Sequence, residues 1–143
     1  QVTASDLSAD ALVLAKDNAK LNRVDISFVL ADVFENVSGC FDIIVSNPPY
    51  ISENDKDEVG LNVLTSEPKM ALFADEDGLA IYRQILEDAD KYLNPQGKLY
   101  FEIGYKQGED LRKLLSLHFP DKHVRVLKDQ FGQDRMVVMD DGN

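Results

Sequence analysis

The fold is decided by residues 41–50, which read Phe-Asp-Ile-Ile-Val-Ser-Asn-Pro-Pro-Tyr. The first six of these residues are mostly apolar and rich in β-branched side chains, which predicts a short buried strand. The two prolines that follow can continue neither a helix nor a strand ladder. The amide of Asn47 and the phenol of Tyr50 are therefore expected in a stiff loop at the carboxyl end of a strand, where open α/β sheets bind their ligands. The alternative is an ordinary turn, because Asn-Pro commonly starts turns.

Strand and helix patterns alternate outward from this loop, which predicts an α/β fold with a mostly parallel sheet covered by helices. The expected strands are Val2–Ser5, Ile26–Leu30, Phe41–Ser46, Lys98–Ile103, 123–128 and 135–140. The last two lie close together in sequence and are expected to form an antiparallel hairpin across Asp129–Asp134. The expected helices run from a Ser8 cap to about Leu21, from an Asp77 cap to about Leu93, ended by Asn94–Gly97, and from Gln107 to His118. The stretch 51–75 is polar and predicts a long loop.

Length and charge restrict the classes of function. The chain has 143 residues, which is one domain's worth, and its 15 Lys and Arg against 26 Asp and Glu give a net charge of −11. This charge disfavours a nucleic-acid-binding surface, which needs cations to displace counterions from phosphates. Residues 51–90 hold eleven of the acids and three Lys or Arg. That run is either a solvated face or a surface that repels polyanions and attracts a basic partner.

Other residue types exclude further classes of site. Cys40 is the only cysteine, so neither an intramolecular disulfide nor a cysteine zinc cluster can form, and it is expected to be a small apolar filler beside a strand. His118 and His123 have no acid at a recognisable spacing and are expected at the surface. No metal site is expected. No signal peptide or membrane span is recognisable, so a cytoplasmic location and no membrane partner are expected.

Polar side chains follow three successive expected strands. The strands end at Asp6, Asp32 and Asn47, and the carboxyl ends of parallel strands share one edge of a sheet. The three side chains are therefore expected to converge on one crevice, where a carboxylate can accept ribose hydroxyls or an exocyclic amine. Taken singly, each aspartate is more typical of a helix cap or a turn.

The loop after the third strand suits an amine or amide substrate. The side-chain oxygen of Asn47 can accept one N–H, and the main-chain carbonyl of Pro48 can accept the other. Holding both hydrogens directs the nitrogen lone pair to one side, so that position and preorganised dipoles, rather than a strong base, would assist attack on an activated methyl group. The Tyr50 ring can lie against the planar amide or base, or it can be an ordinary half-buried aromatic.

These segments together resemble the release-factor glutamine methyltransferase family. The matching segments are Asp6, Ala31–Phe34, Asn47–Tyr50, Glu67–Phe73, Asp77–Leu79 and Glu102–Tyr105. The Asn-Pro-Pro-Tyr loop alone is shared with amino-methyltransferases that act on adenine. The Glu-Pro and Ala-Leu-Phe segment and the Glu-Ile-Gly-Tyr strand end are more specific.

The resemblance implies a Rossmann-like S-adenosylmethionine-dependent fold and a reaction. A methyl group would pass from S-adenosylmethionine to the side-chain amide of the glutamine in the Gly-Gly-Gln loop of peptide-chain release factors. Asp6 would hold the cofactor ribose, and Asp32 and Val33 would border the adenine. Asn47, Pro48, Pro49 and Tyr50 would hold the substrate amide, with Asn47 also beside the cofactor. Structural roles are expected for Glu67 and Glu102.

Two parts of that family are missing from the sequence. A glycine-rich strand and loop for the cofactor, and a helical amino-terminal domain, would both precede Gln1. Because Gln1 is not Met and lies beside an expected strand, we expect residues 1–143 to be the C-terminal part of the catalytic domain. Loss of a mid-sheet strand would favour self-association. The alternatives are an adenine amino-methyltransferase acting on DNA or RNA and a truncated domain that catalyses nothing.

Overall fold

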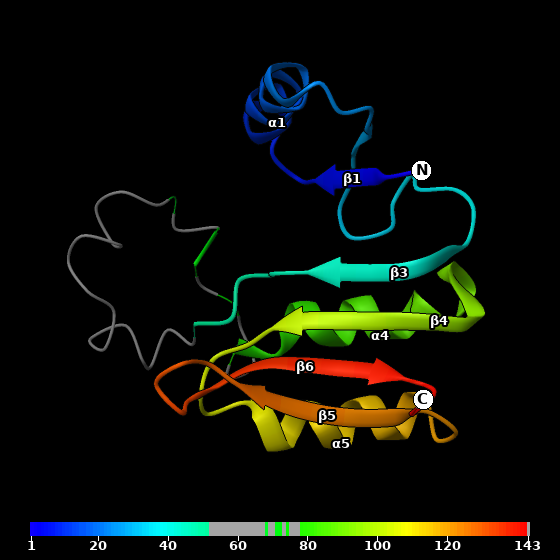
Figure 1. Ribbon diagram of the computed structural model, residues 1–143, viewed down its shortest axis with the longest axis vertical. Coiled ribbons are helices and arrows are strands. Elements are labelled where there is room, and N and C mark those ends of the chain that lie inside the picture. Colours follow the sequence, from blue (N-terminus) through cyan, green and yellow to red (C-terminus); the bar gives the residue numbers. More distant parts are fainter. Residues whose placement is uncertain (52–67, 69–70, 73, 75–77, 143) are drawn as a thin grey trace. The chain divides into compact units, whose positions relative to one another are not determined.

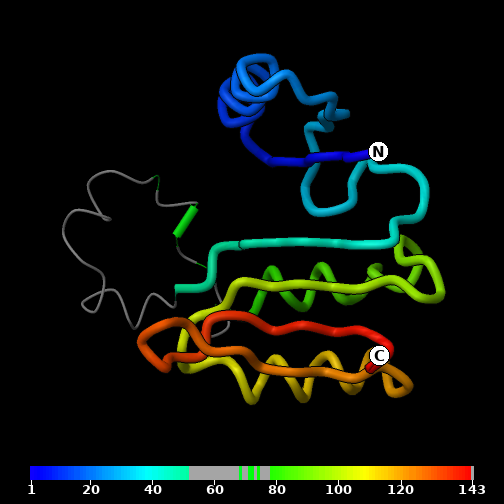
Figure 2. Tube along the Cα trace, viewed as in Figure 1, coloured from blue at the N-terminus to red at the C-terminus, as the bar shows by residue number. Residues whose placement is uncertain are grey.

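The computed structural model describes residues 1–51, 68, 71–72, 74 and 78–142, which are traced in Figures 1 and 2. They form two compact units, Gln1–Gly39 and Cys40–Asn143. Glu67, the Asp77 cap and most of the expected 51–75 loop lie outside the described residues. Among the described residues, no helix combines the length and the apolar character needed to cross a bilayer.

The first unit is a strand–helix–strand motif. It consists of β1 (Thr3–Asp6), α1 (Ala9–Asn22) and β2 (Ser27–Leu30), and the two strands pair in parallel. The expected cap is confirmed, because the Ser8 hydroxyl accepts from the Ala11 N–H at 3.2 Å and so satisfies one of the unpaired donors at the helix start. This motif brings the carboxyl ends of β1 and β2 to one edge of the pair.

The second unit is a mixed sheet covered by two helices. Its elements are β3 (Phe41–Ser46), α4 (Ala80–Tyr92), β4 (Leu93–Glu102), α5 (Gly108–His118), β5 (His123–Lys128) and β6 (Asp134–Asp140). The strand order is β3-β4-β6-β5, in which β3 and β4 are parallel and the other two pairings are antiparallel. The antiparallel C-terminal hairpin predicted from the sequence is therefore confirmed.

The core of this unit lies between the sheet and its helices, α4 and α5, which cover the same face of the sheet (Figure 1). The largest fully buried side chains are those of Tyr82, Leu86, Leu99, Phe101, Ile103, Leu111, Leu115, Val137 and Met139. The rings of Tyr82 and Phe101 meet edge to face with their centroids 5.1 Å apart, a favoured aromatic arrangement. Helix α4 is thereby held against β4, the strand that follows it.

The expected start of β4 is wrong. The sequence predicts a turn over Asn94–Gly97 and a strand from Lys98, but the strand begins at Leu93, directly after α4. Leu93 already pairs with Phe41, and the register shifts before Ile43 pairs with Lys98. The four residues form an irregular strand start, because proline is tolerated at the first residues of a strand and at bulges.

The strands also divide differently from the single sheet expected. Among the described residues, β1 and β2 form a two-stranded sheet of their own, and β3 belongs to the four-stranded sheet. The mid-sheet strand that the family resemblance implies before Gln1 stays a prediction. The other helix and strand bounds differ from expectation by at most three residues.

Candidate functional site

The Asn47–Tyr50 loop follows β3 directly, at the carboxyl end of the parallel β3–β4 pair. Asn47 is exposed, Pro48 is buried, and Pro49 and Tyr50 are partly buried. The two prolines restrict the backbone between the anchored and the exposed part of the loop. The loop thus presents the Asn47 amide to solvent on a restricted backbone. Such an amide can both accept and donate hydrogen bonds.

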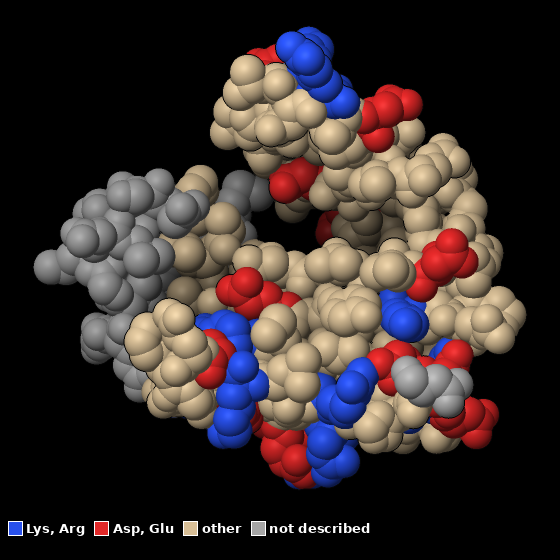
Figure 3. Space-filling view, viewed as in Figure 1, with Lys and Arg blue, Asp and Glu red and all other residues tan. Residues whose placement is uncertain are grey.

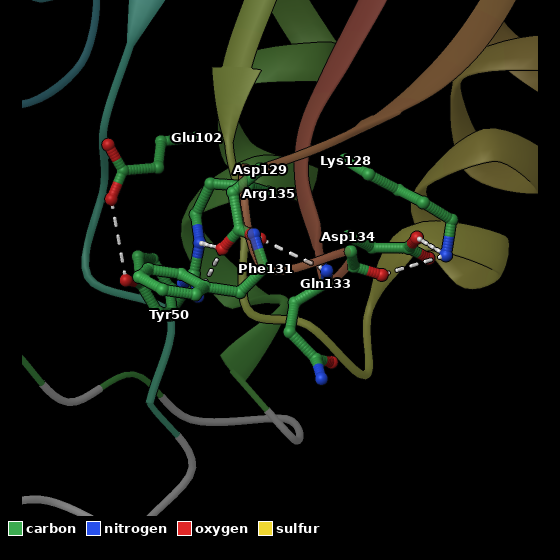
Figure 4. A network of polar contacts seen from close by, with 9 residues as sticks. Tyr50, Glu102, Lys128, Asp129, Phe131, Gln133, Asp134 and Arg135 are labelled. Atoms are coloured by element: carbon green, nitrogen blue, oxygen red, sulfur yellow. Dashed lines mark hydrogen bonds and ion pairs between the residues drawn. The ribbon is translucent and has the colours of Figure 1, made fainter.

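The Tyr50 hydroxyl lies beside the end of β4. It donates toward Glu102 Oε1 at 3.4 Å (Figure 4). Burial, followed by the negative charge of Glu102, raises the pKa of Tyr50 above its ordinary value of 10.0, and Arg135 acts in the opposite direction. Tyr50 is therefore a neutral phenol at physiological pH, able to donate a hydrogen bond and to offer a ring face.

Arg135 connects this end of the sheet to the β5–β6 hairpin. Its guanidinium lies 3.4 Å from Asp129 Oδ2 (Figure 4). The other oxygen of Asp129 accepts the backbone N–H groups of Phe131 at 2.8 Å and Gln133 at 3.1 Å. These backbone hydrogen bonds, Gln133 first, together with Arg135 lower the pKa of Asp129. One carboxylate therefore orders the hairpin tip and orients the cation that faces Tyr50.

A second set of contacts holds the backbone of Tyr50. Gln107, which is buried at the start of α5, donates from Nε2 to the Tyr50 carbonyl at 2.9 Å. Its Oε1 accepts from the Gly104 N–H, also at 2.9 Å. The Tyr82 hydroxyl donates to the main-chain carbonyl of Glu102 at 2.6 Å. From the sequence, Gln107 and Tyr82 are placed only on helices, because no local pattern reports hydrogen-bond partners that lie 57 and 20 residues away.

The first unit holds the other candidate residues. Asp6 pairs with Leu30, and its main-chain carbonyl accepts from the Ala31 N–H at 3.0 Å, so Asp6 and Asp32 lie at the same edge of the β1–β2 pair. Both aspartates are exposed. Asp6 Oδ1 also accepts from the Ser8 N–H at 2.7 Å, which is the turn-forming role expected of a single aspartate. Each unit stands by itself here, so the convergence of these acids with Asn47 stays a prediction.

Val33 has an unusual backbone. Its φ is 51°, a left-handed conformation that is an outlier for a β-branched residue. Such a conformation costs about 1–3 kcal/mol and clusters at ligand sites in proteins. The strain is thus stored next to Asp32, at the edge proposed from sequence to face a cofactor.

Three other expectations concern the surface. His118 and His123 are exposed, as predicted. Cys40 is exposed rather than an apolar filler, because it precedes β3 and its thiol contacts the Lys91 carbonyl at the rim of the unit, at 3.5 Å. Figure 3 shows Lys, Arg, Asp and Glu side chains interspersed over the β5–β6 side of the second unit, whereas the surface over β3 and β4 is mostly uncharged, with charged side chains only toward its two ends. Most of the acidic run lies outside the described residues.

Comparison with known proteins gives close relatives. The chain is 62% identical over 141 residues to a release factor glutamine methyltransferase of Streptococcus pneumoniae, covering 99% of this chain and 50% of that protein. It is 46% identical over 136 residues to the protein of that name in Lactococcus lactis, covering 95% of this chain and 50% of the relative. The chain thus spans about half the length of the curated relatives it matches.

Solved structures with a similar fold are more distant in sequence. A methyltransferase from Pyrococcus furiosus matches with a TM-score of 0.67 at 21% identity, covering 100% of this chain and 64% of that one. A ribosomal protein L11 methylase from Lactobacillus delbrueckii matches with a TM-score of 0.66 at 23% identity, covering 97% and 56%. These likenesses establish the Rossmann-like methyltransferase fold that the sequence predicts.

A family model also matches this chain. Its description is "Methyltransferase small domain", and it matches residues 1–72, which include β1, β2, β3 and the Asn47–Tyr50 loop. Since this match extends over half of the 143 residues, the chain belongs to the methyltransferase small domain family.

Proposed function

We propose that the protein to which this chain belongs methylates the side-chain amide nitrogen of the glutamine in the Gly-Gly-Gln loop of peptide-chain release factors. The observation that carries this proposal is the 62% identity over 141 residues to a release factor glutamine methyltransferase. Within the chain, the proposal rests on Asn47–Tyr50, an exposed amide on a loop that is held by Glu102 at the end of β4 and by Gln107 before α5.

Each residue of the loop has a separate role in holding the substrate amide. The Asn47 side-chain oxygen accepts one N–H of the substrate amide and the Pro48 carbonyl accepts the second, while the Tyr50 ring lies against the amide plane. An amide nitrogen is a poor nucleophile because its lone pair is delocalised. Two fixed acceptors favour the tetrahedral nitrogen of the transition state, and they cost no reorganisation at the moment of reaction.

The proposed cofactor is S-adenosylmethionine, which supplies an electrophilic methyl group when bound. The hydrogen-bond acceptors of the first unit fit the nucleoside part of this cofactor, because the exposed carboxylates of Asp6 and Asp32 share one sheet edge and can accept from hydroxyl and amine groups. Asp6 would hold the ribose. Asp32 and Val33 would border the adenine.

The partner is proposed to be a protein rather than a nucleic acid. The net charge of −11, with eleven acids in residues 51–90, favours a basic protein surface and repels phosphates. Residues 1–143 are proposed to be the C-terminal part of the catalytic domain. A cytoplasmic location also stays a prediction.

The test uses a protein of the relatives' full length that contains these 143 residues. Transfer of a labelled methyl group from S-adenosylmethionine is measured with a release factor, with the same release factor carrying glutamate in place of the Gly-Gly-Gln glutamine, and with adenine-containing DNA and RNA oligonucleotides. We expect label only in the unchanged release factor, at the glutamine amide.

The other arms of this experiment identify the alternatives. Label in the oligonucleotides and none in the release factor would replace the proposal with adenine amino-methylation. Label in neither substrate would leave a domain without catalysis. The 143-residue chain assayed alone reports whether the described units suffice for turnover.

A further inference from the structure

We infer that Gln107 is a positioning residue, whose side-chain amide sets the place of the Asn47–Tyr50 loop by holding the Tyr50 carbonyl. This inference deepens the proposed methyl transfer and rests on it. Gln107 lies 57 positions from Tyr50 in sequence, on the turn between β4 and α5. Nothing in the reaction as proposed above assigns it a role.

The hydrogen bonds of Gln107 have a defined polarity. Gly104 offers an N–H and Tyr50 offers a carbonyl, so only an amide that presents oxygen to one and nitrogen to the other satisfies both, at 2.9 Å each. The Gln107 main-chain N–H also donates to the Gly104 carbonyl at 3.0 Å, which closes the turn. With 8% of Gln107 exposed, these bonds are sheltered from water, and a lost partner would leave a polar group buried without compensation.

The two hydrogen bonds from the Gln107 side chain to Gly104 and Tyr50 are called the Gln107 bridge. Two glycines lie so close to this bridge that it has no room to shift. A Cβ placed on Gly78 would lie 2.1 Å from the Tyr50 carbonyl oxygen and 2.5 Å from Gln107 Nε2. A Cβ on Gly104 would lie 3.1 Å from Gln107 Oε1 and 3.3 Å from Cδ2 of the Tyr50 ring. Gly78 also has a φ of +79°, which glycine adopts without strain. Three segments distant in sequence therefore meet around one amide.

The side chain of Gln107 does not cap α5, although Gln107 lies at the N-cap position of that helix. Gln107 occupies the N-cap of α5, a position that favours Ser, Thr, Asp or Asn because their side chains accept from the first helical N–H groups. Gln107 makes no such side-chain cap bond. Its amide is directed across to the Gly104 turn and the Tyr50 carbonyl instead, which is the arrangement expected of a residue that serves the loop rather than the helix.

The consequence for the reaction follows from the stiffness of the loop. Pro48 and Pro49 fix their own φ angles, so a displacement of the Tyr50 carbonyl is passed to the Pro48 carbonyl and to Asn47. These are the two proposed acceptors of the substrate amide. A misplacement of about 1 Å in such groups can lower a rate about a hundredfold.

The test separates the two bonds of the bridge. In the full-length protein, Gln107→Met removes both bonds at similar size, whereas Gln107→Glu at pH 8 keeps an acceptor for Gly104 but has no donor for Tyr50. We expect both variants to lower kcat/KM for the release factor about ten- to hundredfold, with a fall in kcat, while the Kd of S-adenosylmethionine changes less than about twofold. Gln96→Met and Gln96→Glu, on an exposed glutamine of β4, serve as matched controls.

Hydrogen exchange gives a readout that does not depend on activity. The Gly104 amide should stay protected in Gln107→Glu and exchange faster in Gln107→Met, because only the glutamate retains an acceptor. If Gln107 merely stabilised its own turn, Gln107→Glu would keep the parental kcat and KM, and that result would overturn the inference. Gly78→Ala places a Cβ against both the Tyr50 carbonyl oxygen and Gln107 Nε2, and it should reproduce the kinetic loss should the Gln107 variants fail to fold.

The same measurements separate this inference from the proposed function. If the unsubstituted full-length protein methylates no release factor, the proposed function is contradicted, and with it the role of the bridge in that reaction. If the unsubstituted full-length protein methylates the release factor and the Gln107 and Gly78 variants are equally active, only the positioning role of Gln107 is contradicted.

Discussion

At the scale of single residues, the candidate site depends on the contrast between an exposed side chain and a fixed backbone. Asn47 is exposed, but Pro48, the next residue, is buried, and Tyr50 is bonded at both its hydroxyl and its carbonyl. The side chain proposed to recognise a substrate is thus attached to a backbone segment that is held in place by Pro48 and by the contacts of Tyr50. Such preorganisation contributes to catalysis because little of it has to be created in the transition state.

Asn47→Ala removes one proposed acceptor of the substrate amide. We expect kcat of the full-length protein to fall about a hundred- to thousandfold, since deleting one preorganised polar contact has effects of that size. The Kd of S-adenosylmethionine should change far less. Steady-state kinetics and calorimetry measure both.

The control for Asn47→Ala is Asn94→Ala. Asn94 donates to Asp42 at 2.7 Å at the other end of the β3–β4 pair, so its loss should leave turnover unchanged. Parental turnover in Asn47→Ala would remove Asn47 from the site.

The ionisation of Tyr50 gives a second residue-scale prediction. Arg135 lowers the pKa of Tyr50 against the upward effect of burial and Glu102, so Arg135→Gln should raise that pKa further above 10.0. Tyrosinate absorbance of each protein, minus that of its Tyr50→Phe counterpart, measures the titration. Arg125→Gln, whose guanidinium pairs with Asp140, is the matched control. A Tyr50 pKa that falls in Arg135→Gln would contradict the arrangement in Figure 4.

At the scale of elements, the β5–β6 hairpin is more than a closing strand pair. Its tip is held by Asp129, which accepts two backbone N–H groups and pairs with Arg135, the residue that faces Tyr50. The same carboxylate therefore organises a turn and connects that turn to the edge of the candidate site. Short loops of this kind are often placed by one Asp that bonds its own following backbone.

The hairpin tip should loosen in acid. The folded-state pKa of Asp129 lies below the ordinary 3.8, so its stabilising contribution is fully present above that value and is lost as the pH falls through the lowered pKa. Asp129→Asn should therefore speed amide exchange at Phe131 and Gln133 at neutral pH, with the difference from the parent shrinking in acid. Gln130→Asn, in the same loop, is the control. Its amide exchange rates at Phe131 and Gln133, divided by those of the unsubstituted protein, should not vary with pH. A difference that grows in acid would contradict this sign.

At the scale of the whole molecule, the described residues form two units, and the two halves of the candidate site fall in different ones. Asp6 and Asp32 lie in the first unit, and Asn47–Tyr50 in the second. The carboxylates can contact hydroxyl and amine groups, but residues 1–5 hold no glycine-rich loop. Such loops supply the backbone N–H groups and the close approach that nucleotide-like ligands need.

The 143-residue chain alone is therefore expected to bind S-adenosylmethionine far more weakly than micromolar, to show no turnover, and to self-associate through strand edges. Desolvation and ordering offset what two carboxylates contribute. Calorimetry and light scattering measure affinity and mass, with the full-length protein as the control. Micromolar binding by a monomer would contradict this expectation.

Most of what was predicted from sequence is local. Alternation of apolar residues, the Ser8 cap and the two prolines each act within a few residues, so they predicted the elements to within three residues, apart from the start of β4. That start was missed because the Leu93–Phe41 pairing overrides the turn tendency of Asn94–Gly97.

By itself, the sequence determined the α/β class, the C-terminal hairpin and a polar loop at the end of Phe41–Ser46, because hydrophobic period and proline geometry are properties of neighbouring residues. Only the tertiary structure decided what holds that loop. The amide of Gln107 reaches it from the turn before α5, 57 positions away in sequence, and the cation of Arg135 reaches it from β6. The Tyr82 hydroxyl, from α4, holds the neighbouring Glu102 carbonyl at the end of β4. The physical reason is that a buried hydrogen-bond donor donates to whichever carbonyl the folded chain brings within reach, and the packing of distant segments, rather than the local sequence, decides which carbonyl that is.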